Sequence, residues 1–185
     1  MGKLVKDVFK NVELQNAKIL NSNLGEVKFS KKLNTAIICV ESSENISLIE
    51  IEKFEDEAKN LYKLNSFKIE YKYIGEKIEV DEKKVKDILN EVSFKYAYTL
   101  EAFRICNVAI ESKNIYITFY SRFADFLKQK QIDEYIKKSI EFKYGTKYDV
   151  FLADDKSISK DEEKKSDLNM VRIDELFKKY VNNSE

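Results

Sequence analysis

The sequence has no histidine among its 185 residues, only four glycines and only two cysteines. Without histidine, the chain lacks the commonest general base and the commonest metal ligand of proteins. The glycines stand too far apart to form a phosphate-binding loop or a dinucleotide-binding fingerprint, and Cys39 and Cys106 do not have the spacing of zinc ligands. We therefore expect no catalytic residue, no cofactor-binding residue and no metal ligand in this chain.

The sequence also lacks the marks of export and of membrane insertion. The N-terminal stretch MGKLVKDVFKNVEL has neither the long apolar core nor the cleavage site of a signal peptide. No apolar run approaches the ~20 residues that span a bilayer. Both cysteines lie in apolar, strand-like runs, which predicts buried thiols that stay reduced. These features predict a soluble cytoplasmic protein with no membrane contact.

Charge of neither sign dominates the chain. Its 33 Lys and Arg residues equal its 33 Asp and Glu residues. Residues 1–75 carry 12 basic and 11 acidic side chains, and residues 76–153 carry 14 and 13. Neither half therefore supplies the basic field of a dedicated nucleic-acid binder, although a local basic patch stays possible.

The first half of the chain reads as a small α+β module. Apolar residues at three- and four-residue steps predict a first helix that ends near Glu13. Val27 and Phe29 alternate with polar residues, which predicts a half-buried strand. The apolar, β-branched run Thr35–Val40 predicts a central strand.

A second helix is expected after the polar break at residues 42–45. Its buried stripe comprises Ile51, Phe54, Ala58, Leu61 and Tyr62. Glu55 falls on its polar side, where an ion pair with Lys59 one turn later is expected. Ser66–Tyr73 then alternates apolar and charged residues, which predicts a strand with one wet face.

The second half repeats this order after a boundary near Gly75. The expected elements are a helix capped by Asp81, a short helix over Thr99–Arg104 introduced by the Thr99 hydroxyl, strands over Cys106–Glu111 and Ile115–Tyr120, a long helix from Arg122 to Gly145, and a strand over Lys147–Ala153. The order helix–strand–strand–helix–strand thus occurs twice.

The predicted fold class is α+β, with two small modules that each hold a three-stranded sheet. The expected domains are residues 1–75 and 80–153, followed by a charged linker over residues 154–185. Within that linker, Asn169–Val181 has rough helical spacing, which leaves open either a short docked helix or a frayed end.

Lysines and tyrosines interleave at two places, one around Lys68 and Lys72 and the other around Lys143 and Lys147. Such a surface could stack bases and hold phosphates. It is equally the pattern of a strand whose tyrosines cover a core edge while its lysines face water. The neutral charge of each half favours the structural interpretation over nucleic-acid binding.

The chain resembles the N-terminal region of the PolC-type DNA polymerase III α subunit of low-GC Gram-positive bacteria. The resemblance covers about residues 3–153. The stretches that carry it are VKDVFKNVEL, TAIICVESSENISLIEIEKFEDEAKNLY and NVAIESKNIYITFYSRFADFLKQKQIDEYIKKSI.

The resemblance implies two small domains related to truncated KH-like folds, the first similar to the C-terminal domain of the clamp-loader τ subunit. It implies a role in DNA replication, as a replisome protein–protein interaction module with τ as the expected partner. The family is a DNA-directed DNA polymerase, but its polymerase and exonuclease residues lie in domains outside the matched region, and DNA would be contacted through those domains. The alternative is a KH-like domain that binds single-stranded nucleic acid. No two glycines stand close enough to form the GxxG loop with which KH modules grip the nucleic-acid backbone, which favours protein binding.

Overall fold

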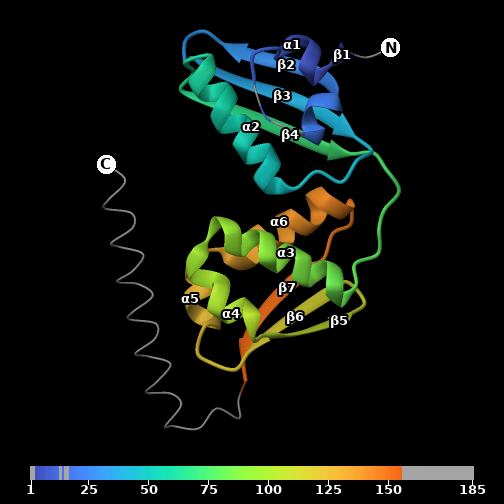
Figure 1. Cartoon of the computed structure of the whole chain (residues 1–185), viewed down its shortest axis with the longest axis vertical. Helices are drawn as coiled ribbons and strands as arrows, with labels where there is room; N and C mark the ends of the chain where they lie inside the picture. The colour runs from blue at the N-terminus through green and yellow to red at the C-terminus, as the bar shows by residue number, and fades with distance from the viewer. Residues whose placement is uncertain (1–2, 13, 15–16, 156–185) are drawn as a thin grey trace. The chain divides into compact units, whose positions relative to one another are not determined.

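The computed structural model describes residues 3–12, 14 and 17–155, and these form two compact units. The first unit comprises Met1–Glu79 and Lys138–Thr146, and the second comprises Val80–Lys137 and the segment that begins at Lys147. Figure 1 shows the elements of each unit. That residues 1–75 and 80–153 are domains that fold independently stays a prediction. The tail expected from residue 154 lies outside the described residues beyond Asp155.

The first unit is built on a four-stranded mixed sheet, with strand order β1-β2-β3-β4. Its elements are β1 (Lys3–Leu4), α1 (Val5–Val8), the 3-10 helix η1 (Lys18–Asn21), β2 (Asn23–Ser30), β3 (Thr35–Ser42), α2 (Leu48–Leu61) and β4 (Ser66–Tyr73). β2 pairs antiparallel with both β1 and β3, and β4 pairs parallel with β3. The expectation of three strands was wrong, because Lys3 and Leu4 pair with the start of β2.

The first helix is also shorter than expected, because tertiary contacts end it. It stops at Val8 instead of continuing toward Glu13, which lies outside the described residues. Phe9 turns inward and meets Phe54 and Phe67 edge-on, with ring centroids 5.8 and 5.6 Å away. Burial of this ring among two others contributes more than another turn of a short, marginal helix.

The core of the first unit lies between α2 and one face of the sheet. Alternate β3 residues are buried, and they pack with α2 and β4; the fully or nearly fully buried members are Ala36, Ile38, Val40, Ile51, Phe54, Ala58, Phe67 and Ile69. Helix α2 begins where the Ser47 hydroxyl accepts a hydrogen bond from the Glu50 amide at 3.2 Å. Leu61 and Tyr62 were expected in the buried stripe but are exposed at its end.

The second unit is built on a three-stranded mixed sheet, with strand order β5-β6-β7. Its elements are α3 (Glu82–Lys95), the 3-10 helix η2 (Ala97–Thr99), α4 (Leu100–Arg104), β5 (Asn107–Glu111), β6 (Asn114–Phe119), α5 (Ala124–Gln129), α6 (Ile132–Tyr144, whose residues from Lys138 belong to the first unit) and β7 (Asp149–Asp154). β5 and β6 pair antiparallel, and β6 and β7 pair parallel. Asp81 caps α3 as expected, since its carboxylate accepts the Lys84 amide at 2.8 Å. The Thr99 hydroxyl does not cap α4, because it donates to the Tyr96 carbonyl instead.

The long helix expected from Arg122 to Gly145 is broken into α5 and α6. Gln131 takes a left-handed conformation with φ of 57° between them. Leu127 and Ile132 are both buried, but residues five positions apart differ by about 140° around one helix. The break brings both side chains to the core. Gly145 ends α6 at φ of 67°, as expected.

Both units are therefore α+β, and each contains an antiparallel strand pair, a helical crossover and a parallel strand. In each sheet one face carries the helices and the core. The opposite faces and the sheet edges are where the two units differ, and they hold the candidate sites.

Candidate protein-binding surfaces

Two of the four lysines expected in a nucleic-acid site are engaged in ion pairs. Lys68 and Lys72 both project from β4 and are exposed. The Lys68 ammonium lies 2.6 Å from a Glu55 carboxylate oxygen, and the Lys72 ammonium lies 3.0 Å from Glu41. A phosphate would have to compete with a carboxylate at each lysine.

The other two lysines of that prediction belong to different units. Lys143 lies in the last turn of α6, in the first unit, with its ammonium 5.7 Å from the centre of the Tyr144 ring. Lys147 is exposed in the second unit, just before β7. The first unit thus contains Lys68, Lys72 and Lys143, of which Lys68 and Lys72 share one strand, while Lys147 belongs to the second unit. Nucleic-acid binding by these four residues stays a prediction.

The open face of the first sheet carries alternating charges. Lys28 on β2 lies 3.4 Å from Glu26 and 3.9 Å from Glu70 on β4. Lys72 and Glu41 form a further cross-strand pair at 3.0 Å. Exposed pairs of this kind contribute little stability, about 0–1 kcal/mol each, but they keep the face hydrated. This face is mainly charged, with half-buried Ile37 and Cys39 between the ion pairs.

Glu55 was expected on the polar side of α2, paired with Lys59, and this was wrong. The residue is only 8% exposed. One of its carboxylate oxygens accepts the backbone N–H of Ile69 at 2.8 Å, and the other contacts Lys68 at 2.6 Å. Glu55 thus accepts a backbone N–H of β4, the strand that forms one border of the sheet.

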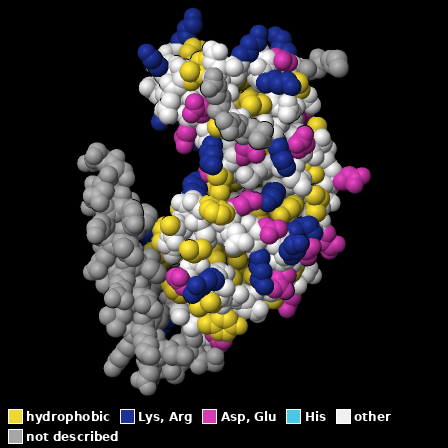
Figure 2. Space-filling view, in the orientation of Figure 1, with side chains coloured by type: hydrophobic (Ala, Val, Ile, Leu, Met, Phe, Trp, Pro, Cys, Tyr) yellow, Lys and Arg dark blue, Asp and Glu magenta, His cyan; other side chains and the backbone are white. Residues whose placement is uncertain are grey.

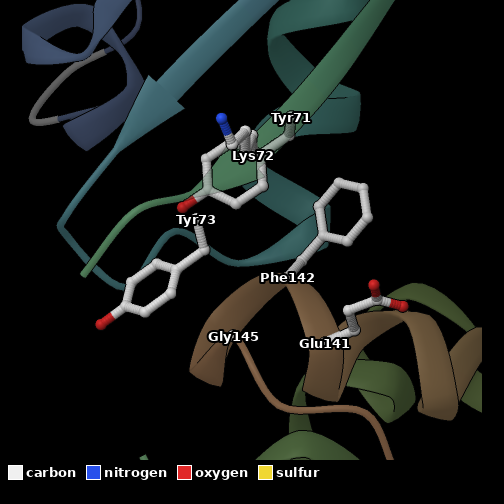
Figure 3. Close-up of a pocket in the computed structure, with 6 residues that line it drawn as sticks. All are labelled: Tyr71, Lys72, Tyr73, Glu141, Phe142 and Gly145. Carbon is white, nitrogen blue, oxygen red and sulfur yellow. The ribbon is translucent and has the colours of Figure 1, made fainter. Parts of the chain in front are cut away.

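A small pocket opens beside β4 within the first unit, and Figure 3 shows the residues that line it. These are Tyr71, Lys72, Tyr73, Glu141, Phe142 and Gly145. Its volume of about 170 Å³ is below the ~300–1,000 Å³ of small-molecule sites. Tyr71 stacks on Phe142 with ring centroids 5.2 Å apart.

The hydroxyls of the two pocket tyrosines are already used. Tyr71 donates to the Glu44 carbonyl at 3.1 Å, and Tyr73 donates to the Glu76 carbonyl at 3.0 Å. Burial raises the pKa of Tyr71 to about 12, so this phenol stays neutral and is a poor general base at neutral pH. The pocket offers an aromatic wall but no poised reacting group.

Both cysteines are free thiols, but they are half-buried and not fully buried as expected. Cys39 donates to a Glu70 carboxylate oxygen at 3.2 Å, and this hydrogen bond is the main cause that raises its pKa. Burial raises the pKa of Cys106, whose thiol donates to the Phe103 carbonyl at 3.3 Å. Since the thiolate is the nucleophile, both cysteines are weak nucleophiles at neutral pH.

The second sheet differs from the first in its open face. We call it the open aromatic face; its residues, all exposed or half-buried, are Asn107, Ala109, Glu111, Asn114, Tyr116, Thr118, Asp149, Phe151 and Ala153. Ala109, Tyr116 and Phe151 lie side by side in register across the three strands. The Tyr116 and Phe151 rings stack with centroids 5.3 Å apart. They are 36% and 47% exposed.

No lysine or arginine belongs to the open aromatic face. Its two charged residues, Glu111 and Asp149, are acidic and lie in one register row at one end. Lys137 of α6 reaches Asp149 at 2.8 Å. The aromatic middle of the face is therefore flanked by an acidic end and by an uncharged end.

A second aromatic group of this unit joins the end of α3 to α5 and α6. Its rings are half-buried and meet in the order Tyr135, Tyr96, Tyr98, Phe126. The Lys95 ammonium lies 4.6 Å from the Tyr135 ring centre, and the Lys130 ammonium lies 5.6 Å from that of Phe126. The ring contacts join the helices, and the two lysines add cation–π contacts at the outer rings Tyr135 and Phe126.

The described residues form no metal-binding cluster, and the face that Figure 2 shows carries no field of a single sign. Within residues 3–12, 14 and 17–155, no three His, Cys, Asp or Glu residues form a group that could hold a metal ion. Figure 2 shows basic and acidic side chains interspersed over the visible face, with apolar side chains between them. Among the same residues, no helix has the length and apolar content needed to cross a membrane.

The open aromatic face was not predicted from the sequence, because the apolar alternation of its strands marks their core-facing residues. In the strand expected over Ile115–Tyr120, the apolar residues Ile115, Ile117 and Phe119 alternate, and all three are buried. The signal for the opposite face was an aromatic residue in the middle of each of two strands, at Tyr116 and Phe151. That signal acquires meaning only through the parallel register of β6 and β7.

The comparisons with known proteins do not identify a family. No protein-family model matches the chain, and no curated protein matches it. Among solved structures, the chain is similar to the periplasmic domain of the T3SS inner membrane protein PrgH from S. typhimurium, at 11% sequence identity and a TM-score of 0.24. The match covers 71% of this chain and 61% of that chain, so the chain spans less than two thirds of the length of that structure. At this identity and TM-score the likeness carries no argument about function.

Proposed function

We propose that the chain is a non-catalytic protein-binding module, and the open aromatic face carries the proposal. The equivalent face of the first sheet is covered by ion pairs, whereas the aromatic middle of this one has none. A pair of stacked, partly exposed rings is the kind of surface that protein interfaces use as an anchor.

The size of the face favours a narrow binding partner. Three strands at about 4.8 Å spacing and five or six residues at about 3.3 Å rise give roughly 250 Å² of flat surface. A stable protein–protein interface needs about 800 Å² on each side. A single helix or peptide segment fits this area, and further contacts from the rest of the unit would complete the interface.

The identity of the module follows the sequence resemblance. We propose that it corresponds to the N-terminal region of a PolC-type DNA polymerase III α subunit, acts in DNA replication in the cytoplasm, and attaches to the clamp-loader τ subunit or another replisome protein. The repeated order of strand, strand, helix and strand in both units supports the KH-like relation that this resemblance implies. The replisome assignment rests on the sequence stretches alone.

Titration calorimetry of the chain against purified C-terminal region of τ tests the proposal. Complete burial of one large apolar side chain contributes about 1.5–3 kcal/mol, and each of the two rings has a third to a half of its surface exposed. The double change Tyr116→Ser with Phe151→Ser should therefore weaken binding about tenfold, which is 1.4 kcal/mol. Phe94→Ser is the matched control, because Phe94 is 88% exposed on α3, outside the face.

Two results would refute this function as stated. Absence of heat with τ at high micromolar concentration would remove τ as the partner. Equal affinity of the wild type and the double variant would remove the open aromatic face as the binding surface. Circular dichroism of the variants establishes that the change in affinity is not caused by unfolding.

Nucleic-acid binding is tested in parallel with a fluorescein-labelled single-stranded oligonucleotide at low salt. Since Lys68 and Lys72 are already paired with carboxylates, we expect a flat anisotropy titration. Salt-dependent binding that is lost when Lys68, Lys72, Lys143 and Lys147 are all changed to alanine would instead establish the alternative function.

A further inference from the structure

β2 presents an unpaired edge over most of its length. β1 pairs only with Asn23 and Leu24, and no described residue pairs with the outer side of β2 beyond them. The register with β3 shifts between Leu24 and Val27, and five consecutive residues, from Gly25 to Phe29, are exposed. The first sheet thus ends in an open stretch of backbone donors and acceptors, which is a template for another strand.

Two apolar side chains stand on this open edge. Val27 pairs with Ile38 and Phe29 pairs with Ala36, so both point to the face that holds the core. Helix α2 covers that face over β3 and β4 but leaves Val27 49% and Phe29 54% exposed. The alternation that predicts a half-buried strand is present, but the described residues leave about half of each of these two side chains exposed.

The opposite edge of the same sheet is protected. There, the Glu55 carboxylate already accepts the Ile69 amide at 2.8 Å, and Lys68 bonds to the same carboxylate. An added strand at β4 would have to displace the buried Glu55 carboxylate from the Ile69 amide. An added strand at β2 displaces only water, so the two edges are not equivalent.

The β2 edge ends at a basic tip. The turn to β3 contains Lys31 and Lys32, and residues 23–34 hold three lysines against one glutamate. Hydrogen bonds of 2.9 Å hold this turn to the one that follows α2: the Asn34 side chain donates to the Lys63 carbonyl, and the Asn65 side chain donates to the Leu33 carbonyl. The tip therefore holds its lysines on a braced pair of turns.

We propose that the outer edge of β2 binds an extended, acidic segment of another protein, which adds to the sheet as a fifth strand. Backbone hydrogen bonds to residues 25–30 give affinity, as in other cases of strand addition. Val27 and Phe29 contact apolar side chains at alternate positions of the segment. Lys31 and Lys32 contact acidic residues at the end that reaches the tip.

Charge favours this partner over a second copy of the chain. Residues 23–34 of each copy carry three lysines against one glutamate, so pairing two β2 edges brings two stretches of the same net charge together. Like charges facing each other across strands are destabilising. An acidic segment meets the opposite charge at the tip, and the site does not involve the open aromatic face.

The test uses the whole chain and fluorescein-labelled ten-residue peptides in which valine alternates with threonine and one end carries two glutamates. A second peptide carries lysines in place of the glutamates. A third has the acidic sequence with N-methyl groups on alternate amides, which removes the backbone hydrogen bonds of one edge. We expect saturable anisotropy with the acidic peptide, and binding at least tenfold weaker with each of the other two.

Variants of the chain locate the site. Val27→Thr with Phe29→Ser should weaken the acidic peptide about tenfold, and Lys31→Glu with Lys32→Glu should reverse the preference between the acidic and the basic peptide. Lys53→Glu, an exposed change on α2, should alter neither. Circular dichroism melting shows which variants remain folded, and the charge-reversal pair lies on an exposed turn where folding should persist.

Three outcomes would overturn the proposal. Equal binding of the N-methylated peptide would show that no strand is added. An unchanged peptide preference in the Lys31→Glu, Lys32→Glu variant would remove the basic tip. If sedimentation shows a dimer of the wild type that Phe29→Ser dissociates, the β2 edge binds a second copy of the chain. None of these bears on binding of τ to the other unit, which has its own variants.

Discussion

Replacement of Glu55 tests how the protected edge of the first sheet is held. Glu55→Ala removes the acceptor of the Ile69 amide, which is buried, and leaves Lys68 without its carboxylate. An unsatisfied buried donor costs about 1–3 kcal/mol. The ion pair adds only about 0–1 kcal/mol, because the Lys68 side chain is 65% exposed. We expect the free energy of unfolding to fall by about 2–3 kcal/mol.

Two further variants separate these contributions. Glu55→Gln keeps an oxygen acceptor for the Ile69 amide and loses the charge, so it should cost about 1 kcal/mol or less. Lys68→Ala should cost no more than that. Glu57→Ala, an exposed change on the same helix, is the control and should lie within about 0.5 kcal/mol of the wild type.

Urea unfolding followed by circular dichroism measures these differences, and amide hydrogen exchange reports on Ile69 directly. Loss of the carboxylate should speed exchange at Ile69 more than at the central strand β3. If Glu55→Ala unfolds at the same urea concentration as Glu57→Ala and the Ile69 amide stays protected, Glu55 does not hold this edge, and the contrast between the two sheet edges fails with it.

Three other changes give measurable effects. Gly145→Ala should lower the unfolding free energy by about 2 kcal/mol, because Gly145 has φ of 67° and an added methyl would overlap the Tyr73 ring. A side-chain hydrogen bond from Lys84 is the main cause that holds the pKa of Asp81 below its usual 3.8. The stabilising effect of the ionised Asp81 carboxylate is complete above pH 3.8 and is lost as the pH falls through the folded-state pKa. The thermal midpoint of Asp81→Asn should therefore vary less than that of the wild type between about pH 5 and pH 2. Glu70→Gln should speed alkylation of Cys39 at pH 7.5, because the hydrogen bond to Glu70 is the main cause that raises the pKa of this thiol; unchanged alkylation would contradict this.

The sequence predicts those elements whose pattern is local. β4 has the expected bounds, Ser66–Tyr73, and Asp81 caps α3 as expected, because strand alternation and an N-cap depend on neighbouring residues. The break between α5 and α6 could also have been predicted, since two apolar residues five positions apart do not share one helical face. The short α1 could not, because the inward turn of Phe9 depends on partners far along the chain.

The candidate surfaces were harder to predict than the fold. Glu55 looks like any acidic residue on the polar side of a helix. Its burial follows from how close α2 lies to the border strand β4, and sequence spacing does not give that distance. The pairing of Tyr116 with Phe151 likewise requires the register of two strands that are separated by two helices. In both cases the sequence contains the residues but does not show which neighbour they contact in the fold.

The strand that holds Val27 and Phe29 shows a different limit. Alternation of apolar and polar residues reports that one face of a strand avoids water, and it does not report what covers that face. In the interior of a sheet the cover is a helix of the same chain, as for β3 under α2. At a border strand the helix need not extend over the apolar face. The sequence of the strand then still alternates, although no helix covers its apolar side chains. Val27 and Phe29 are half-exposed and lie beside an unpaired backbone and a basic tip. This is the arrangement of a core strand that lacks a neighbouring strand on one side. A border strand with no partner would more commonly carry inward-pointing charge or proline, the devices that blunt exposed edges, and the side of β2 that should be covered carries valine and phenylalanine instead.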